Sequence, residues 1–298
     1  MTRLVLFGAP IAIAISILFN SGGDSGLPTN PKQADQEQAA GQDEDAELRK
    51  QEDARVADMP AGLASPELKE IASRLVSTAE SSRLDWRSQY GVIEASGDGS
   101  GYCGGIIAFC SGTDDMLNVV ETFSKQHPGN ALAPFLPALR KVNGTDSHEG
   151  LDPGFTAAWK KSAEDPEFRA TQDHVRDTLY FEPAVRQAKL DGLSPLGQYI
   201  YYDAFVVNGS GSGPGGFYGI RAAALEEEDS VYEGGDEKAY LNAFLDAARG
   251  AILAKKNKHQ RDTSRIDTAQ RVFLREGNLT LKTPLVWKMY GETYRIPS

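Results

Sequence analysis

The sequence predicts a mainly helical α+β domain that follows an N-terminal stretch outside the fold. Apolar residues recur at helical spacing through most of the chain from Ser65 onward. A short run, Tyr90 to Ile93, precedes a glycine-rich segment and predicts a strand. Of the 298 residues, 40% are hydrophobic and 9% aromatic, which is enough for a sizeable core and excludes a wholly disordered chain.

Residues 1–22 have the pattern of an export signal. Arg3 precedes an uncharged run from Leu4 to Phe19, and small polar residues follow it. The run is shorter than the roughly 20 apolar residues that span a bilayer, which favours a cleaved signal peptide over a signal anchor. We therefore expect an extracellular, secreted protein, with tethering to the membrane by an uncleaved segment as the alternative.

Residues 23–60 differ in composition from the rest of the chain. They consist mainly of Gln, Asp, Glu, Ala and Gly, with almost no large apolar residue. Such a segment cannot bury enough surface to offset the entropy that ordering costs. We expect a disordered acidic linker here and one folded domain over residues 61–298.

The first helix of that domain begins at Ser65-Pro66-Glu67. Serine is a good N-cap, proline suits the first helical position, and an acid suits the positive first turn. Glu80 lies near the helix end, just beyond the edge of an apolar stripe that runs from Leu68 to Ala79. Partial burial and the helix dipole both penalise an ionised carboxylate there, as a general acid requires. The alternative is a solvated glutamate at a helix end.

The glycine-rich segment from Gly97 to Gly105 contains one acid, Asp98. Glycine at this density permits positive φ and close approach of a ligand. The spacing Gly99-x-Gly101-x-x-Gly104 matches a dinucleotide-binding pattern, but the βαβ context that this site needs is missing. A calcium loop is excluded because its alternating acids and closing Glu are absent.

The remaining chain is predicted to be helical. It has no G-x-S-x-G nucleophile elbow, and the acidic run from Glu226 to Asp229 is typical of a solvated face. Asp203 stands inside an apolar run, and pairing with Arg249 and Arg265 would satisfy all three charges; three unrelated surface charges are the alternative. The candidate helices cover about residues 113–125, 131–141, 155–163, 165–174, 181–191, 194–207, 216–228, 236–256 and 265–276.

Charge and composition exclude several classes of partner. The net charge of −11 does not suit a general nucleic-acid binder and favours a neutral or cationic ligand. Two cysteines and four scattered histidines cannot form a disulfide framework or a structural zinc site. No metal or organic cofactor is implied.

From about Leu63 to Ile296 the chain closely resembles the family 46 chitosanases of Streptomyces type. The resemblance is carried by long, specific runs. These are Leu84-Asp85-Trp86, Gly97-Asp98-Gly99, Gly104-Gly105-Ile106-Ile107, Phe109-Cys110-Ser111-Gly112-Thr113, Pro137-Ala138-Leu139, Lys141-Val142-Asn143-Gly144, Tyr201-Tyr202-Asp203-Ala204, Gly234-Gly235-Asp236-Glu237, Asp262-Thr263-Ser264-Arg265, Gln270-Arg271-Val272-Phe273-Leu274 and Gly277-Asn278-Leu279.

The resemblance implies a two-lobed, lysozyme-like fold with a small antiparallel sheet and a substrate cleft between the lobes. It implies inverting endo-hydrolysis of the β-1,4 bonds of chitosan by a monomer that needs no protein partner. Glu80 would be the general acid and Asp98 the general base. Asp115 would bind the sugar, and Asp203, Arg249 and Arg265 would form a charge network that holds the acid.

This sequence departs from the family pattern at three positions. Ser100 replaces a usual Arg, Asn208 replaces a loop His, and Cys103 replaces a Thr that helps to hold the attacking water. A thiol is a poorer hydrogen-bond partner than a hydroxyl, so we expect weaker control of that water. The resemblance treats Cys110 as a lone buried thiol; a Cys103–Cys110 disulfide is the alternative in an exported protein.

Two other functions stay open at this point. One is a lysozyme-like hydrolase of peptidoglycan or acetylated chitin. The other is a catalytically impaired chitosan-binding surface protein, in which Ser100 and Cys103 mark lost activity. Both rank below a chitosanase because Glu80 and Asp98 are present.

Overall fold

The computed structural model describes residues 46–298, without the side chain of His259. Residues 46–58 form a helix, which differs from the disordered linker expected over residues 23–60. This stretch is rich in Ala, Glu and Arg, which favour helices, and Arg186 pairs with Glu52 at 2.8 Å and Asp53 at 2.9 Å. The predicted signal and residues 23–45 of the predicted linker lie outside the described residues.

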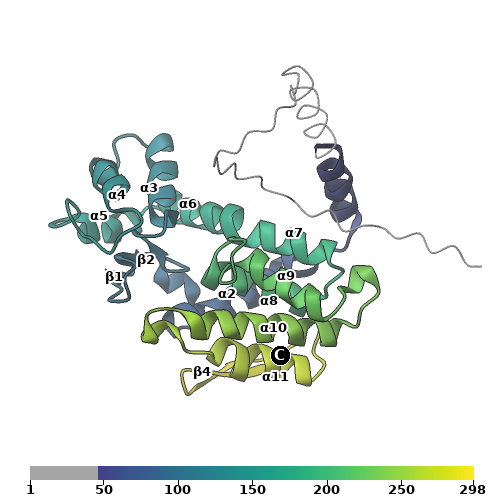
Figure 1. Cartoon of the computed structure of the whole chain (residues 1–298). Helices are drawn as coiled ribbons and strands as arrows, with labels where there is room; N and C mark the ends of the chain where they lie inside the picture. Colours follow the sequence, from purple (N-terminus) through teal and green to yellow (C-terminus); the bar gives the residue numbers. More distant parts are fainter. Residues whose placement is uncertain (1–45) are drawn as a thin grey trace, which may run out of the picture. The chain divides into compact units, whose positions relative to one another are not determined.

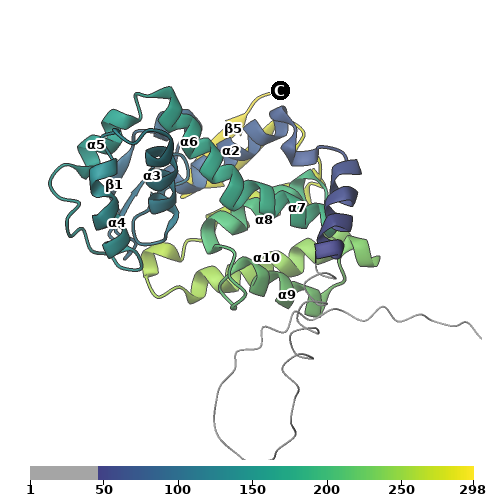
Figure 2. The ribbon, with the colours of Figure 1, turned by 90° about the horizontal axis from the view of Figure 1, so that it is seen from above.

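Contacts divide the chain into Met1–Gln51 and Glu52–Ser298, and the second unit contains two lobes (Figures 1 and 2). One lobe holds the first sheet (residues 93–110) with helices α3–α6 (residues 115–176). The other holds α2 (Pro66–Ser81), α7–α11 (residues 182–275) and the second sheet (residues 285–296). The continuous helical run α6–η4–α7 links the lobes, so the expected two-lobed, mainly helical architecture is confirmed.

The helices follow the predicted ranges to within a few residues. Serine or aspartate side chains cap several of them: Ser65, Asp165, Ser194 and Asp236 each accept a backbone N–H of the first turn. From residue 59 onward the helices are η1 (Gly62–Ala64), α2 (Pro66–Ser81), η2 (Trp86–Gln89), α3 (Asp115–Gln126), η3 (Ala133–Phe135), α4 (Leu136–Val142), α5 (Phe155–Ser162), α6 (Pro166–Arg176), η4 (Asp177–Phe181), α7 (Glu182–Leu190), α8 (Pro195–Asn208), α9 (Phe217–Glu227), η5 (Val231–Glu233), α10 (Glu237–Ala254), η6 (Lys258–Gln260), η7 (Arg265–Gln270) and α11 (Arg271–Arg275).

The expected small sheet is antiparallel and has the order β1 (Ile93–Ala95), β2 (Tyr102–Gly104) and β3 (Phe109–Cys110). Its glycines serve the packing of the protein itself. A Cβ on Gly104 would lie 2.6 Å from the Val92 carbonyl oxygen, and one on Gly105, where φ is +81°, would lie 2.4 Å from Gln172 Oε1. Gly104 and Gly105 thus allow strands and α6 to approach each other, a different use from the expected approach of a ligand.

A second antiparallel hairpin was not predicted from the sequence. It pairs β4 (Leu285–Met289) with β5 (Glu292–Ile296). Alternate side chains of β4 are buried, and the buried Trp287 donates from Nε1 to Thr78 Oγ1 at 3.0 Å. The hairpin thereby covers α2, the helix that carries Glu80.

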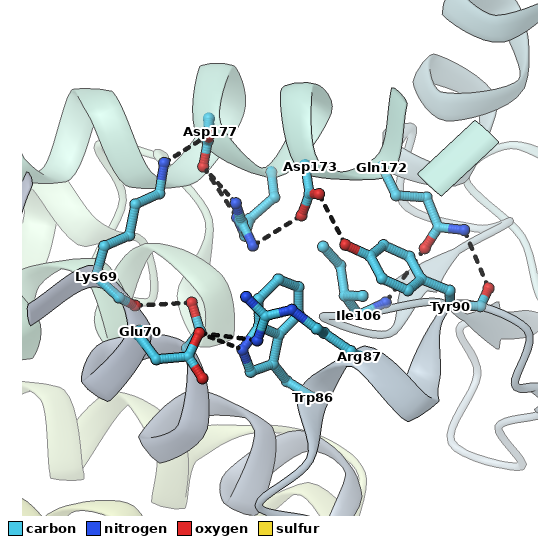
Figure 3. A network of polar contacts seen from close by, with 11 residues as sticks. Lys69, Glu70, Trp86, Arg87, Tyr90, Ile106, Gln172, Asp173 and Asp177 are labelled. Carbon is cyan, nitrogen blue, oxygen red and sulfur yellow. Dashed lines mark hydrogen bonds and ion pairs between the residues drawn. The ribbon is translucent and has the colours of Figure 1, made fainter. Parts of the chain in front are cut away.

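A partly buried charge network centred on Arg176 joins α2, α6 and the segment before β1 (Figure 3). Arg176, only 6% exposed at its side chain, pairs with Asp173 at 3.1 Å and with Asp177 at 2.9 Å. Lys69 of α2 also pairs with Asp177, and the Tyr90 hydroxyl donates to Asp173, both at 2.7 Å. The network therefore fixes the helical link to both lobes.

Candidate active site

One cavity of about 1180 Å³ lies between the two lobes. Its walls are supplied by the end of α2, the first sheet and its loops, η4, the end of α8 and residues 255–265. Glu80, Asp98 and Asp115 all line it, so the structure brings together three of the acids singled out from the sequence. Asp203 and Arg249 are not among its lining residues.

Glu80 occupies the penultimate position of α2, as its spacing predicted. Its side chain is 19% exposed, and Arg265 Nη2 donates to Oε1 at 2.6 Å. The contact leaves Oε2 as the carboxyl oxygen that Arg265 does not engage.

Arg265 connects Glu80 to the buried Asp203 of α8. Arg265 Nη1 donates to Asp203 Oδ1 at 3.3 Å, and Gln270 Nε2 donates to Asp203 Oδ2 at 2.7 Å. Burial raises the pKa of Asp203 above its ordinary value, although the charge of Arg265 opposes this effect. One arginine thus bridges two carboxyls, one buried and one in the cleft.

The expected place of Arg249 in this network is wrong. Arg249 Nε donates to both oxygens of Asp267 at 3.0 Å. The Arg249 side chain is 41% exposed, whereas Asp203 is 2% exposed, so the two groups lie in different environments. Gln270, which sequence analysis did not single out, takes the second position beside Asp203.

Asp98 lies in the loop between β1 and β2 and accepts three hydrogen bonds. Ser96 Oγ and the Ser100 backbone N–H donate to Oδ1 at 2.6 and 3.0 Å. Gln260 Nε2, from the segment after α10, donates to Oδ2 at 2.7 Å. Burial alone raises the pKa of Asp98, but these donors outweigh it and hold the pKa below its ordinary value. Asp98 is therefore ionised at neutral pH.

Asp115 begins α3 and is 8% exposed. The Cys110 N–H and Thr113 Oγ1 donate to Oδ1, both at 2.8 Å, and the Tyr180 hydroxyl donates to Oδ2 at 3.0 Å. Burial raises the pKa of Asp115 to about 6 against the effect of these donors. The carboxylate is charged at neutral pH and uncharged in moderately acidic solution.

Cys103 and Cys110 form a disulfide, so the expectation of a lone buried Cys110 thiol is wrong. The two residues are direct partners across β2 and β3, and their Cα atoms lie 4.1 Å apart. Such closely spaced cross-strand pairs bring the two sulfurs within bonding reach. Cys103 consequently offers no thiol donor to the cleft, and the bond fixes the wall beside Asp98 and Asp115.

Two further cleft residues have distinctive surroundings. Asn208 lines the cavity, and no described group forms a hydrogen bond with its buried Nδ2 or Oδ1. Lys255 Nζ donates to the Val207 carbonyl at 2.9 Å, and burial lowers its pKa. Sequence analysis missed Gln260, Lys255 and Tyr180 because only the fold brings them beside acids far away in the sequence.

The described residues contain no group of three or more His, Cys, Asp or Glu side chains arranged to hold a metal ion. None of their helices is long and apolar enough to cross a bilayer.

Comparisons with known proteins place the chain in one enzyme family. Residues 74–285 match glycosyl hydrolase family 46. The chain is 55% identical over 238 residues to a chitosanase of a Streptomyces species, covering 80% of this chain and 85% of the relative. It is 52% identical over 237 residues to a chitosanase of a Nocardioides species, covering 80% and 84%.

The solved structures that resemble this fold are also chitosanases. A chitosanase co-crystallised with substrate superposes with a TM-score of 0.78 at 51% identity, over 80% of this chain and 100% of the other. A family 46 chitosanase of Gynuella sunshinyii in complex with chitotetraose gives a TM-score of 0.73 at 30% identity, over 78% of this chain and 99% of the other.

Proposed function

The chain belongs to glycosyl hydrolase family 46, and from that premise we propose how its cleft performs the reaction. The protein is a chitosanase with the lysozyme-like fold of this family, and it hydrolyses internal β-1,4 bonds of chitosan with inversion. One observation carries the assignment of roles. Glu80 and Asp98 come from different elements and line one cleft. Glu80 pairs with Arg265, whereas uncharged donors such as Gln260 hold Asp98 ionised.

Glu80 is the general acid of this proposal. Arg265 orients it through Oε1, which leaves Oε2 to carry the proton toward the leaving oxygen. The buried Asp203 shares the charge of Arg265, so that charge does not act on Glu80 alone. Arg265 and Asp203 therefore position the acid without touching the sugar.

Asp98 is the general base of this proposal. It must accept a proton from the water that attacks the anomeric carbon, and inversion requires it to lie across the sugar from the acid. Its lowered pKa keeps it ionised and ready to accept that proton at working pH. The donors from Ser96 and Ser100 keep the carboxylate oriented within its loop.

The substrate is a carbohydrate chain with protonated amines. Acidic side chains along the cavity, among them Asp85, Glu94, Asp115 and Asp262, favour a cationic polymer. We assign Asp115 to an amine of the bound sugar because it lines the cavity and is charged at neutral pH. Residues 61–298 would act as a monomeric catalytic domain of a secreted enzyme, behind a signal at residues 1–22 and a linker at residues 23–60.

The decisive experiment measures reducing ends released from highly deacetylated chitosan. Glu80→Gln and Asp98→Asn keep the shape of each side chain and remove its acid or base function. Each is expected to lower kcat at least about 100-fold, the usual range for lost general acid–base catalysis. NMR of the first products should show inverted anomers.

Glu67→Gln is the matched control, because Glu67 lies on the same helix and is exposed. It should leave the rate unchanged. A folded parent that releases no reducing ends would contradict the chitosanase assignment. Faster cleavage of N-acetylated oligomers would favour a lysozyme-like substrate, and full activity of Glu80→Gln would remove Glu80 from the chemistry.

A further inference from the structure

One short segment forms hydrogen bonds with both carboxyls of the cleft. Arg265 of η7 donates to Glu80, and Gln260 of η6 donates to Asp98. Glu80 and Asp98 belong to different lobes, because α2 carries one and the β1–β2 loop carries the other. The segment 260–265 therefore spans the cleft and contacts both sides of it.

Chemistry fixes which end of the Gln260 amide faces Asp98. An ionised carboxylate only accepts hydrogen bonds, so Nε2 must point toward it and Oε1 must point away. The other donors to Asp98, Ser96 and Ser100, belong to its own loop and move with it. Among described residues, Gln260 is the donor that holds Asp98 from the opposite lobe.

We propose that Gln260 is a positioning residue for the hydrolysis, which fixes the general base Asp98 at a set separation from the general acid Glu80. The inference rests on the proposed function. An inverting enzyme needs its two carboxyls roughly 6.5–9.5 Å apart, with room for one water. A relative movement of the lobes changes that separation, and a segment bonded to both carboxyls resists the change.

The same contact affects the charge of the base. The Gln260 N–H stabilises ionised Asp98, so its loss raises the pKa of Asp98. Lys255 is a charged group that acts directly on Asp98. The cavity also includes Glu80, Glu94, Asp262 and Arg265. These groups are unchanged in a Gln260 variant. A shift in the pH dependence of kcat/KM therefore reports the loss of the hydrogen bond from the Gln260 amide to Asp98.

The test uses the active protein and a soluble oligomer of glucosamine. Gln260→Ala should lower kcat about tenfold and leave KM within about twofold, since the amide holds the base and not the sugar. The low-pH limb of kcat/KM should move upward by about half to one pH unit. Gln260→Glu, nearly the same size, places a like charge against Asp98 and should move that limb further.

Lys258→Ala is the matched control, because Lys258 is exposed on the same short helix. It should keep kcat, KM and the pH profile, and melting curves should show that all variants are folded. A Gln260→Ala enzyme with the parent's kcat and pH profile would overturn the proposal while the chitosanase assignment stands. An inactive parent would instead contradict the assignment itself.

Discussion

Asp115 illustrates how burial and hydrogen bonding set the state of a single side chain. Its position at the start of a helix was predicted, and so was its place on the cleft wall. Its surroundings were not: strand β3 supplies the Cys110 N–H and η4 supplies the Tyr180 hydroxyl. These neighbours enclose the carboxylate, and burial raises the pKa to about 6. Its charge therefore changes within a working pH range.

The first prediction follows from this pKa. Above pH 6 Asp115 is ionised and attracts a sugar ammonium; below pH 6 it is protonated and neutral. Asp115→Asn should raise KM for a glucosamine oligomer about tenfold at pH 7, the size of one charge-assisted hydrogen bond. The ratio of the two KM values should fall toward one as the pH drops through about 6.

The titration of the substrate amine also enters this ratio, because only a protonated amine pairs with the ionised Asp115 carboxylate. The effect of Asp115 is therefore read on the acid side, where the amine stays protonated. Steady-state kinetics between pH 4.5 and pH 7.5 would measure the ratio. A ratio that does not vary with pH would mean that Asp115 does not bind the amine through its charge.

At the scale of elements, the β2–β3 hairpin departs most from expectation. The sequence placed two cysteines on one glycine-rich segment but did not decide whether they bond. The antiparallel register decides it, because it sets Cys103 directly opposite Cys110. The same hairpin donates the Cys110 N–H to Asp115, so the disulfide supports a wall of the active site.

The second prediction concerns the stability that this bond contributes. The disulfide closes a short loop, for which the loss of chain entropy in the unfolded state gives about 2 kcal/mol. The double variant Cys103→Ser, Cys110→Ser should be less stable by about that amount in denaturant unfolding.

Reductant provides the matched control. It should shift the unfolding of the parent by a similar amount and leave the double variant unchanged. Titration of two free thiols in the untreated, unfolded parent would be incompatible with the disulfide.

At the scale of the whole molecule, the proposed reaction requires the two lobes to keep a fixed relative position. Glu80 of one lobe and Asp98 of the other would then contact the same sugar. The Arg176 network supplies part of this constraint, since it binds α2 to the helical link between the lobes (Figure 3). Arg176 is almost fully buried between Asp173 and Asp177. Its removal leaves Asp173 without a paired cation and leaves Asp177 with Lys69 alone.

The third prediction is therefore a large loss of stability in Arg176→Met, which keeps much of the side-chain length and removes the charge. Breaking a fully buried ion pair from one side typically costs about 3–5 kcal/mol. A loss of about 2 kcal/mol is expected here, because Asp173 and Asp177 are 35% and 21% exposed and Asp177 keeps Lys69. Lys161→Ala, which breaks the exposed Lys161–Glu164 pair, should change stability by less than about 1 kcal/mol. If Arg176→Met and Lys161→Ala lowered the free energy of unfolding by the same amount, Arg176 would have no special role in stability.

Local sequence patterns were sufficient to predict most of the helices of this protein. Apolar periodicity and the Ser65 cap predicted helices, because both signals lie within one turn or one face. The motifs around Glu80 and Asp98 pointed to two carboxyls that the structure places in one cavity. The helix over residues 46–58 and the β4–β5 hairpin were not predicted. The helix forms charged contacts with Arg186, and the hairpin packs on α2. Both partners lie far away in the sequence.

Only the tertiary structure decided the partners of the reactive groups. Asp203 and Arg249 looked like one network in the sequence, but burial separates them and places Gln270 beside Asp203. Gln260 contacts Asp98 across the cleft. Hydrogen bonds and charges act over a few ångströms in space, and sequence spacing does not encode such distances between elements. The sequence therefore determined which residues we propose for the chemistry, and the fold determined what holds each of them.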